Sequence, residues 1–202
     1  GQNSMYYYAE SGDNAYNTAV GGSTLYALTT GHGNMALGYQ AGHLVSTGQR
    51  NVCIGLKSGY NIGAENYNTY VGSLAGFYSR GTGNVAIGYV ALSKVSSGSS
   101  NVAIGQTSGQ SLTTGSNNLM VGQGAGNKIV SAGANTLLGS GAGYQLVDSN
   151  DNYNVGIGTY SLYRAGGADP NSNIAIGYYA IGQGHSTVTG NNPKQNVAIG
   201  KF

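Results

Sequence analysis

The 202-residue sequence contains no tryptophan, one cysteine and two prolines. A single cysteine excludes an intramolecular disulfide, and two prolines exclude collagen and polyproline structure. Charged residues make up only 7% of the chain, against about 25% in a typical soluble protein. The eight basic residues are scattered, so no basic patch indicates a nucleic-acid partner. No apolar run approaches the ~18 residues of a membrane span and no signal peptide is visible, so membrane insertion is not expected.

Glycine is in excess, at 37 of 202 residues, and hydrophobic residues make up 40% of the chain. The pentapeptide Asn-Val-Ala-Ile-Gly occurs three times, and the relaxed pattern Asn-x-x-(Val/Ile/Leu)-Gly occurs eleven times. The first steps between copies are 16–17 residues, and the last three are 19, 19 and 23. Such a period indicates stacked coils of one elongated unit. The copies begin at Asn17, Asn34, Asn51, Asn68, Asn84, Asn101, Asn118, Asn135, Asn154, Asn173 and Asn196.

Each copy, numbered from its Asn, predicts a short strand that ends at the Gly of position five. The aliphatic residues favour a strand, and the Gly permits a corner with positive φ. Positions two and four share one face and are aliphatic or Thr, so we expect that face to be buried inside the coil. We also expect the Asn side chains of successive coils to stack in an amide ladder. Cys53 replaces the Ala of position three and is expected to be a small buried residue.

Position three would then point outward, yet it is never charged and never Ser, Asn or Gln. One coil encloses only one interior, so a second apolar face needs cover from outside the coil. The simplest cover is another copy of the same chain, which predicts self-association along the length of the solenoid. The interface residues expected on this reasoning are Ala86, Ala103, Met120 and Ala175.

The copies resemble the repeats of a known family. The pattern Asn-Val-Ala-Ile-Gly-x-x-Ala/Ser, with its Gly-containing return, resembles the left-handed β-roll of YadA-like trimeric adhesin heads and the trimeric fibres of phage tails and bacterial surfaces. The resemblance implies an all-β, left-handed parallel β-roll (β-solenoid), here of about eleven coils, assembled as a parallel homotrimer. It implies attachment to a surface and no catalytic residues. The period is longer than that of adhesin heads, which favours the fibre branch.

Catalytic and metal-binding signals are weak. The chain has six carboxylates and no two share a repeat position, whereas glycoside hydrolysis needs two held close together. The three histidines lack metal-ligand spacing, and the glycine-rich corners lack the lysine of a phosphate loop. We therefore expect no enzyme activity, cofactor or metal. A tailspike-type polysaccharide depolymerase and a purely structural fibre shaft remain as alternatives.

Ligand-binding residues are expected toward the C-terminal end, where the returns between strands lengthen. Loops of this kind on a rigid scaffold are common places for binding residues, although they could instead cap the roll. Residues 1–16 are expected to be a lead-in or cap, residues 17–139 regular coils and residues 140–202 coils with longer loops. The candidate ligand-binding residues are Tyr153, Tyr160, Tyr163, Arg164, Asp169, Tyr178, Tyr179 and His185.

The sequence thus predicts a trimeric fibre or adhesin head that attaches to a cell. Its expected partners are two further copies of itself and a surface glycan or receptor on a host or prey cell. Its expected place is extracellular, on a virion tail fibre or a bacterial surface. The chain begins mid-pattern and stops inside a copy, which suggests a piece of a longer protein.

Overall fold

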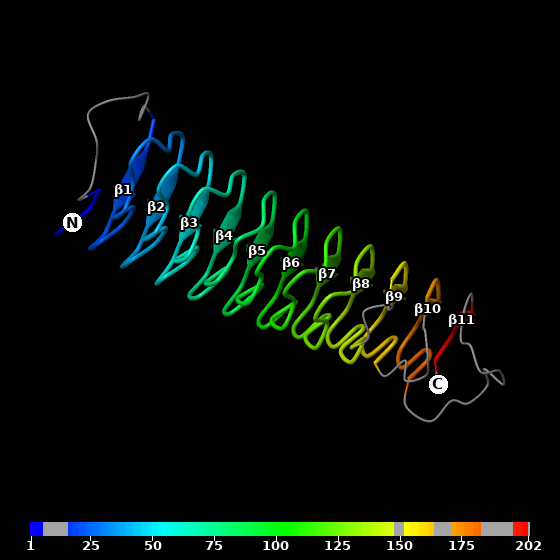
Figure 1. The fold of residues 1–202 in the computed structure, drawn as a ribbon. Coiled ribbons are helices and arrows are strands. Elements are labelled where there is room, and N and C mark those ends of the chain that lie inside the picture. Colours follow the sequence, from blue (N-terminus) through cyan, green and yellow to red (C-terminus); the bar gives the residue numbers. More distant parts are fainter. Residues whose placement is uncertain (6–15, 148–151, 164–170, 183–195, 202) are drawn as a thin grey trace.

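The repeats form one parallel β-solenoid. The computed structural model describes residues 1–5, 16–147, 152–163, 171–182 and 196–201. Within these residues, eleven strands of three residues lie in one sheet in chain order, and each pairs in parallel with the next. Figure 1 shows the coils stacked along one axis as an elongated rod. The strands are β1 (Thr18–Val20), β2 (Met35–Leu37), β3 (Val52–Ile54), β4 (Thr69–Val71), β5 (Val85–Ile87), β6 (Val102–Ile104), β7 (Leu119–Val121), β8 (Thr136–Leu138), β9 (Val155–Ile157), β10 (Ile174–Ile176) and β11 (Val197–Ile199).

The register never slips, because equivalent repeat positions pair throughout the stack. Ala86 pairs with Ala103 between β5 and β6, and Ala175 still pairs with Ala198 between β10 and β11. The longer returns near the C-terminal end therefore leave the strands in line. Near the N-terminus, residues 1–5 add to the stack, since Met5 N–H donates to Thr24 O at 2.9 Å. The predicted all-β parallel solenoid is confirmed.

The Gly at position five can be no other residue without strain. Gly88 has φ +136°, and a Cβ there would lie 2.6 Å from the carbonyl oxygen of Gly105 in the next coil. That separation is shorter than a normal contact, and the same close approach recurs at other position-five glycines. The close spacing of the coils along the axis thus requires a residue without a Cβ at this corner.

The Asn ladder runs the whole length of the solenoid. From Asn34 onward, each Asn of position one donates its backbone N–H to the Oδ1 of the preceding Asn, at 2.9–3.2 Å. Most also donate Nδ2–H to the same oxygen, as Asn101 does to Asn84 at 3.1 Å. Asn101 Nδ2 donates further to Gly115 O at 2.9 Å. Because these amides are buried, the bonds satisfy polar groups that water cannot reach. The predicted ladder is confirmed.

The faces of the strand are opposite to those predicted. The middle residue of nearly every strand, position three, is buried within the single chain, while positions two and four are half-buried or exposed. The residues expected at the intersubunit face are each 0% exposed inside the coil: Ala86, Ala103, Met120 and Ala175. The predicted interface residues are therefore wrong.

The physical reason for this inversion is the narrowness of the coil. Position three faces position nine across the interior: a Cβ on Gly59 would lie 2.5 Å from Cys53 Sγ, and one on Gly76 would lie 2.6 Å from the Tyr70 ring. Only a small residue fits at position three unless position nine is Gly. The larger aliphatic residues of positions two and four consequently face outward. Position twelve, as in Leu112, supplies much of the remaining core.

One coil shows how the core compensates for a large side chain at position three. Tyr70 is 0% exposed in a place that other coils fill mostly with Ala. Position nine of this coil is Gly76, and position twelve is Ser79 instead of an aliphatic residue. The hydroxyl groups of Tyr70 and Ser79 form a hydrogen bond. Burial of the tyrosine raises its pKa far above the usual value.

Cys53 is buried, as predicted, and has no disulfide partner. Burial raises the pKa of its thiol to about 12, since the thiolate would lose its hydration. The side chain therefore acts as a small apolar residue of the core.

Candidate functional site

Two surfaces of the rod carry features that the fold alone does not require. The first is the outer face of the sheet, formed by positions two and four. The second is the edge that follows the strands, formed by positions six to eleven.

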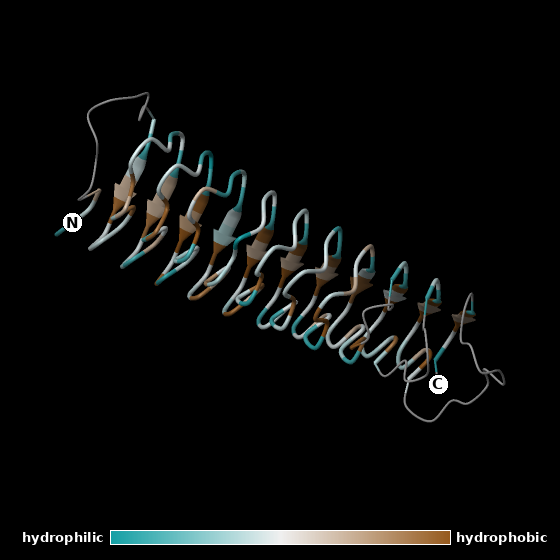
Figure 2. Cartoon of the chain, in the orientation of Figure 1, coloured by the Kyte–Doolittle hydropathy of each residue, from teal (hydrophilic) through white to brown (hydrophobic). Residues whose placement is uncertain are grey.

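The outer sheet face is almost wholly apolar. Ile87 and Ile104 are 38% and 37% exposed at position four, and Leu37 is 47% exposed. Figure 2 shows most of the strands as hydrophobic, with β4 as a more hydrophilic interruption. A soluble protein rarely exposes so long an apolar surface. The more exposed members are Val20, Met35, Leu37, Ile87, Ile104, Ile157, Ile174, Val197 and Ile199.

Four of the predicted ligand-binding tyrosines do come together near the C-terminal end. The ring centroids of Tyr160 and Tyr163 are 5.2 Å apart, edge to face, and Tyr160 lies 5.1 Å from Tyr179. Tyr178 in turn lies 4.9 Å from Tyr179. Partial burial, and then the neighbouring tyrosines, raise the pKa of Tyr179. These rings gather because β9 and β10 are adjacent and the tyrosines occupy positions six, seven and ten of their coils.

Tyr153 lies apart from this cluster, in the turn that precedes its strand, whereas the others follow theirs. It is 68% exposed and lines a polar depression of about 310 Å³ together with Ser116, Asn117 and Asn152. Asn152 Oδ1 accepts the Gly133 N–H at 2.6 Å there. Arg164, Asp169 and His185 lie outside the described residues. The structure therefore gathers four of the eight candidates.

Sequence reasoning missed a column of aromatic rings at position ten. Tyr26, His43, Tyr60 and Phe77 stack in successive coils with centroids 4.9–5.1 Å apart. Tyr144 resumes the column by stacking on Tyr163 at 5.5 Å. Alignment of the tenth positions of the repeats was the signal that could have revealed it. Because most ring faces in the column cover one another, the column chiefly stiffens this edge.

Nothing in the described part of the chain resembles a metal or redox centre. No group of three His, Cys, Asp or Glu residues there could hold a metal ion. Among these residues, no helix is long and apolar enough to cross a membrane. The chemistry available to the described surface is apolar contact, ring stacking, amide or hydroxyl hydrogen bonding, and attraction of anions by exposed lysine and arginine side chains. Comparisons with family models, curated proteins and solved structures find no match to this chain.

Proposed function

We propose that this chain is part of a homotrimeric fibre that attaches to a cell surface outside the cell, as a phage tail-fibre segment or a bacterial surface fibre. In this assembly three left-handed rolls of about eleven coils lie parallel and cover one another's apolar sheet faces. The observation that carries the proposal is the exposed aliphatic face of the sheet. The number of subunits rests on the resemblance of the repeats to YadA-like heads and tail fibres.

The apolar face supports a second copy as the covering partner. The face extends along the whole stack at one fixed spacing, and only a surface with the same repeat matches it over that length. Identical chains around an axis parallel to the rod meet this condition, and such symmetry is the usual basis of homo-oligomers. Aliphatic contacts at about 25 cal/mol per Å² buried would supply the stabilisation.

Assembly is tested by light scattering on purified protein. The wild type is expected to be a trimer at micromolar concentration, and a folded wild-type monomer would contradict the proposal. Ile87→Asp and Ile104→Asp should dissociate the trimer, since each would bury an unpaired charge at every interface. Val130→Asp is the matched control, because Val130 is 43% exposed yet lies at position thirteen, outside the sheet face.

Ala86→Asp separates this arrangement from one with position three at the interface. Because Ala86 is 0% exposed within the chain, the charge would enter the core of the coil and should destroy the β-sheet signal in circular dichroism. If the variant kept this signal and was a folded monomer, the result would instead support an interface formed by position three.

Attachment is proposed to use the C-terminal tyrosine cluster and the longer returns that follow its tyrosines in the sequence. Replacing residues 164–170 and 182–194 with returns of the regular length is expected to weaken binding of labelled trimer to cells. A shortened trimer that stays folded and binds undiminished would place the attachment site elsewhere. If the wild-type trimer does not bind cells at all, a purely structural shaft is favoured.

The depolymerase alternative has a direct assay. Glu65 is the one carboxylate side chain among the described residues, while glycosidases act through a pair of carboxyl groups. Reducing-sugar release from surface polysaccharide is expected to stay at background. Sustained release by purified trimer would favour the enzyme instead.

A further inference from the structure

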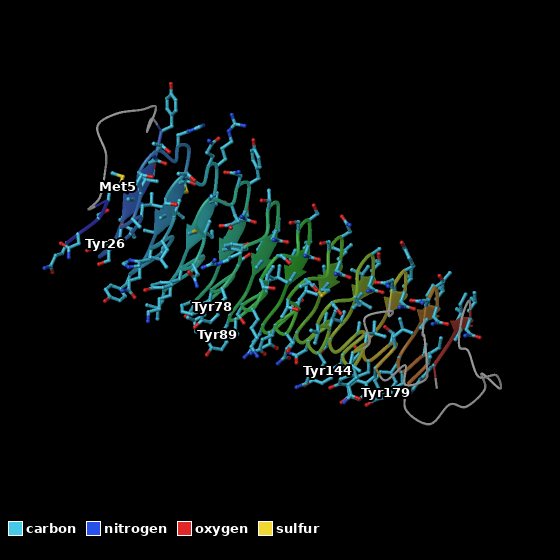
Figure 3. The ribbon with its side chains drawn as sticks, in the orientation of Figure 1. Met5, Tyr26, Tyr78, Tyr89, Tyr144 and Tyr179 are labelled. Atoms are coloured by element: carbon cyan, nitrogen blue, oxygen red, sulfur yellow. The ribbon has the colours of Figure 1, made fainter. Side chains whose placement is uncertain are left out.

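One edge of the rod concentrates most of the exposed aromatic rings. We call positions six, seven, ten and eleven of the coils the tyrosine–lysine flank. Of the 17 tyrosines in the sequence, ten occupy these positions: Tyr26, Tyr39, Tyr60, Tyr78, Tyr89, Tyr144, Tyr160, Tyr163, Tyr178 and Tyr179. Figure 3 shows that Tyr26, Tyr78, Tyr89, Tyr144 and Tyr179 follow a single edge from one end of the rod to the other.

The rings on this flank have two different roles. Those of position ten stack on one another and form a rigid base. Others are more exposed: Tyr39 is 55% exposed, Tyr89 52%, and Tyr78, whose ring packs edge to face on Phe77 of the column, 54%. An exposed tyrosine supplies a flat apolar face and a hydroxyl group at little cost in conformational entropy. Surfaces of this kind suit the apolar faces and hydroxyl edges of sugar rings.

Between β3 and β7, the flank carries a cation at position seven or eleven of every second coil. Lys57 lies in the coil of β3, Lys94 in that of β5 and Lys128 in that of β7. With ~4.8 Å between strands, successive cations are roughly 10 Å apart along the axis. Lys57 Nζ lies 5.9 Å from the centroid of the Tyr60 ring. Lys201 repeats this arrangement in the coil of β11, with Nζ 5.9 Å from the Tyr178 ring.

The described part of the flank carries no carboxylate. Glu65 belongs to the return that precedes β4, where its Oε2 accepts the Gly63 N–H at 2.7 Å. No described acidic side chain therefore offsets the lysines, and the flank favours an anionic ligand.

We propose that the tyrosine–lysine flank binds a linear acidic polysaccharide that lies along the rod and carries one carboxylate per disaccharide. This inference rests on the proposed function and names the ligand class of its attachment surface. Two coils match the length of an extended disaccharide, so carboxylates meet lysines while the intervening sugars lie over exposed tyrosines. The ligand would thus bind along the regular coils, in addition to the C-terminal cluster.

The spacing of the charges favours a polysaccharide over nucleic acid or an anionic membrane. Duplex DNA carries one charge per ~1.7 Å and is bound by clustered Lys and Arg. Here the flank positions carry one cation in each alternate coil, and the coils between carry none at these positions. A membrane surface attracts clusters of four to eight basic residues, which this flank lacks.

The test uses the whole trimer with immobilised hyaluronan, a polymer with one carboxylate per disaccharide. Binding is measured by biolayer interferometry at low and physiological ionic strength, beside dextran, duplex DNA and phosphatidylserine vesicles. Hyaluronan should bind, more weakly as salt rises, and dextran should not. Lys94→Gln with Lys128→Gln should lower the affinity roughly fivefold, as for two exposed charge pairs. Tyr89→Leu should lower it about threefold through loss of the ring.

Arg50→Gln is the matched control, because it removes an exposed cation from the opposite edge, where Arg50 lies 5.6 Å from the Tyr67 ring. Its affinity should equal that of the wild type. Equal binding of dextran, an unchanged affinity of the double lysine variant, or tighter binding of DNA or vesicles would overturn the inference. Absence of a wild-type trimer, by contrast, would refute the proposed assembly itself. A trimer that binds cells but not hyaluronan refutes the ligand class alone.

Discussion

Replacing one amide in the middle of the Asn ladder should destabilise the protein far more than replacing an amide on its surface. Asn101 takes part in four side-chain hydrogen bonds. Its Nδ2 donates to Asn84 Oδ1 and Gly115 O, and its Oδ1 accepts from the backbone N–H and the Nδ2 of Asn118. Asn101→Ala removes all four.

Two of the partners would keep a bond. Asn84 Oδ1 still accepts the backbone N–H of residue 101, and Asn118 Nδ2 still donates to Ala132 O. The backbone N–H of Asn118 and the carbonyl of Gly115 lose the partners described above. At ~1–3 kcal/mol for each buried group left unsatisfied, the free energy of unfolding should fall by about 2–6 kcal/mol per chain.

Urea unfolding followed by circular dichroism measures this loss, with all variants at one protein concentration because assembly makes apparent stability concentration-dependent. Asn61→Ala is the matched control, since Asn61 is half-buried and lies on the flank outside the ladder. It should change stability by no more than about 0.5 kcal/mol. If Asn101→Ala and Asn61→Ala unfold at the same urea concentration, the ladder does not stabilise the stack as argued.

Three further outcomes follow from the core. Ser79→Val should destabilise the protein by about 1–3 kcal/mol by removing the hydroxyl that forms a hydrogen bond with buried Tyr70; if the Tyr70→Ala and Ser79→Val effects simply add in the double variant, the two sites are independent. Gly88→Ala should lower the melting temperature sharply, because its Cβ would lie 2.6 Å from the Gly105 carbonyl; unchanged melting would exclude this close approach. Because burial raises the Cys53 thiol pKa to about 12, iodoacetamide at pH 8 should label it only after unfolding, and labelling of native protein monitored by mass spectrometry would contradict its burial.

Local sequence alone was enough to determine the period, the strands and the ladder. Asn at position one and Gly at position five recur at a fixed spacing, and each has a specific local role. The buried Asn amide bonds to its counterpart in the neighbouring coil and to a nearby backbone carbonyl, as at Asn101, and the corner at Gly88 has φ +136°. Requirements of this kind depend on one coil and its neighbour, so the repeat pattern reveals them.

Which face of the strand is buried was decided only by the tertiary structure. Alternation shows that Ala86 and Ile87 point in opposite directions, but the preference of large aliphatic residues for burial favoured Ile87 inside. The opposite wall of the coil reverses this choice. Where position three is large, as at Tyr70, position nine is Gly76, and a Cβ there would touch the ring. The width of the coil, which no single strand encodes, therefore admits the small residue and leaves the aliphatic residues on the outer face.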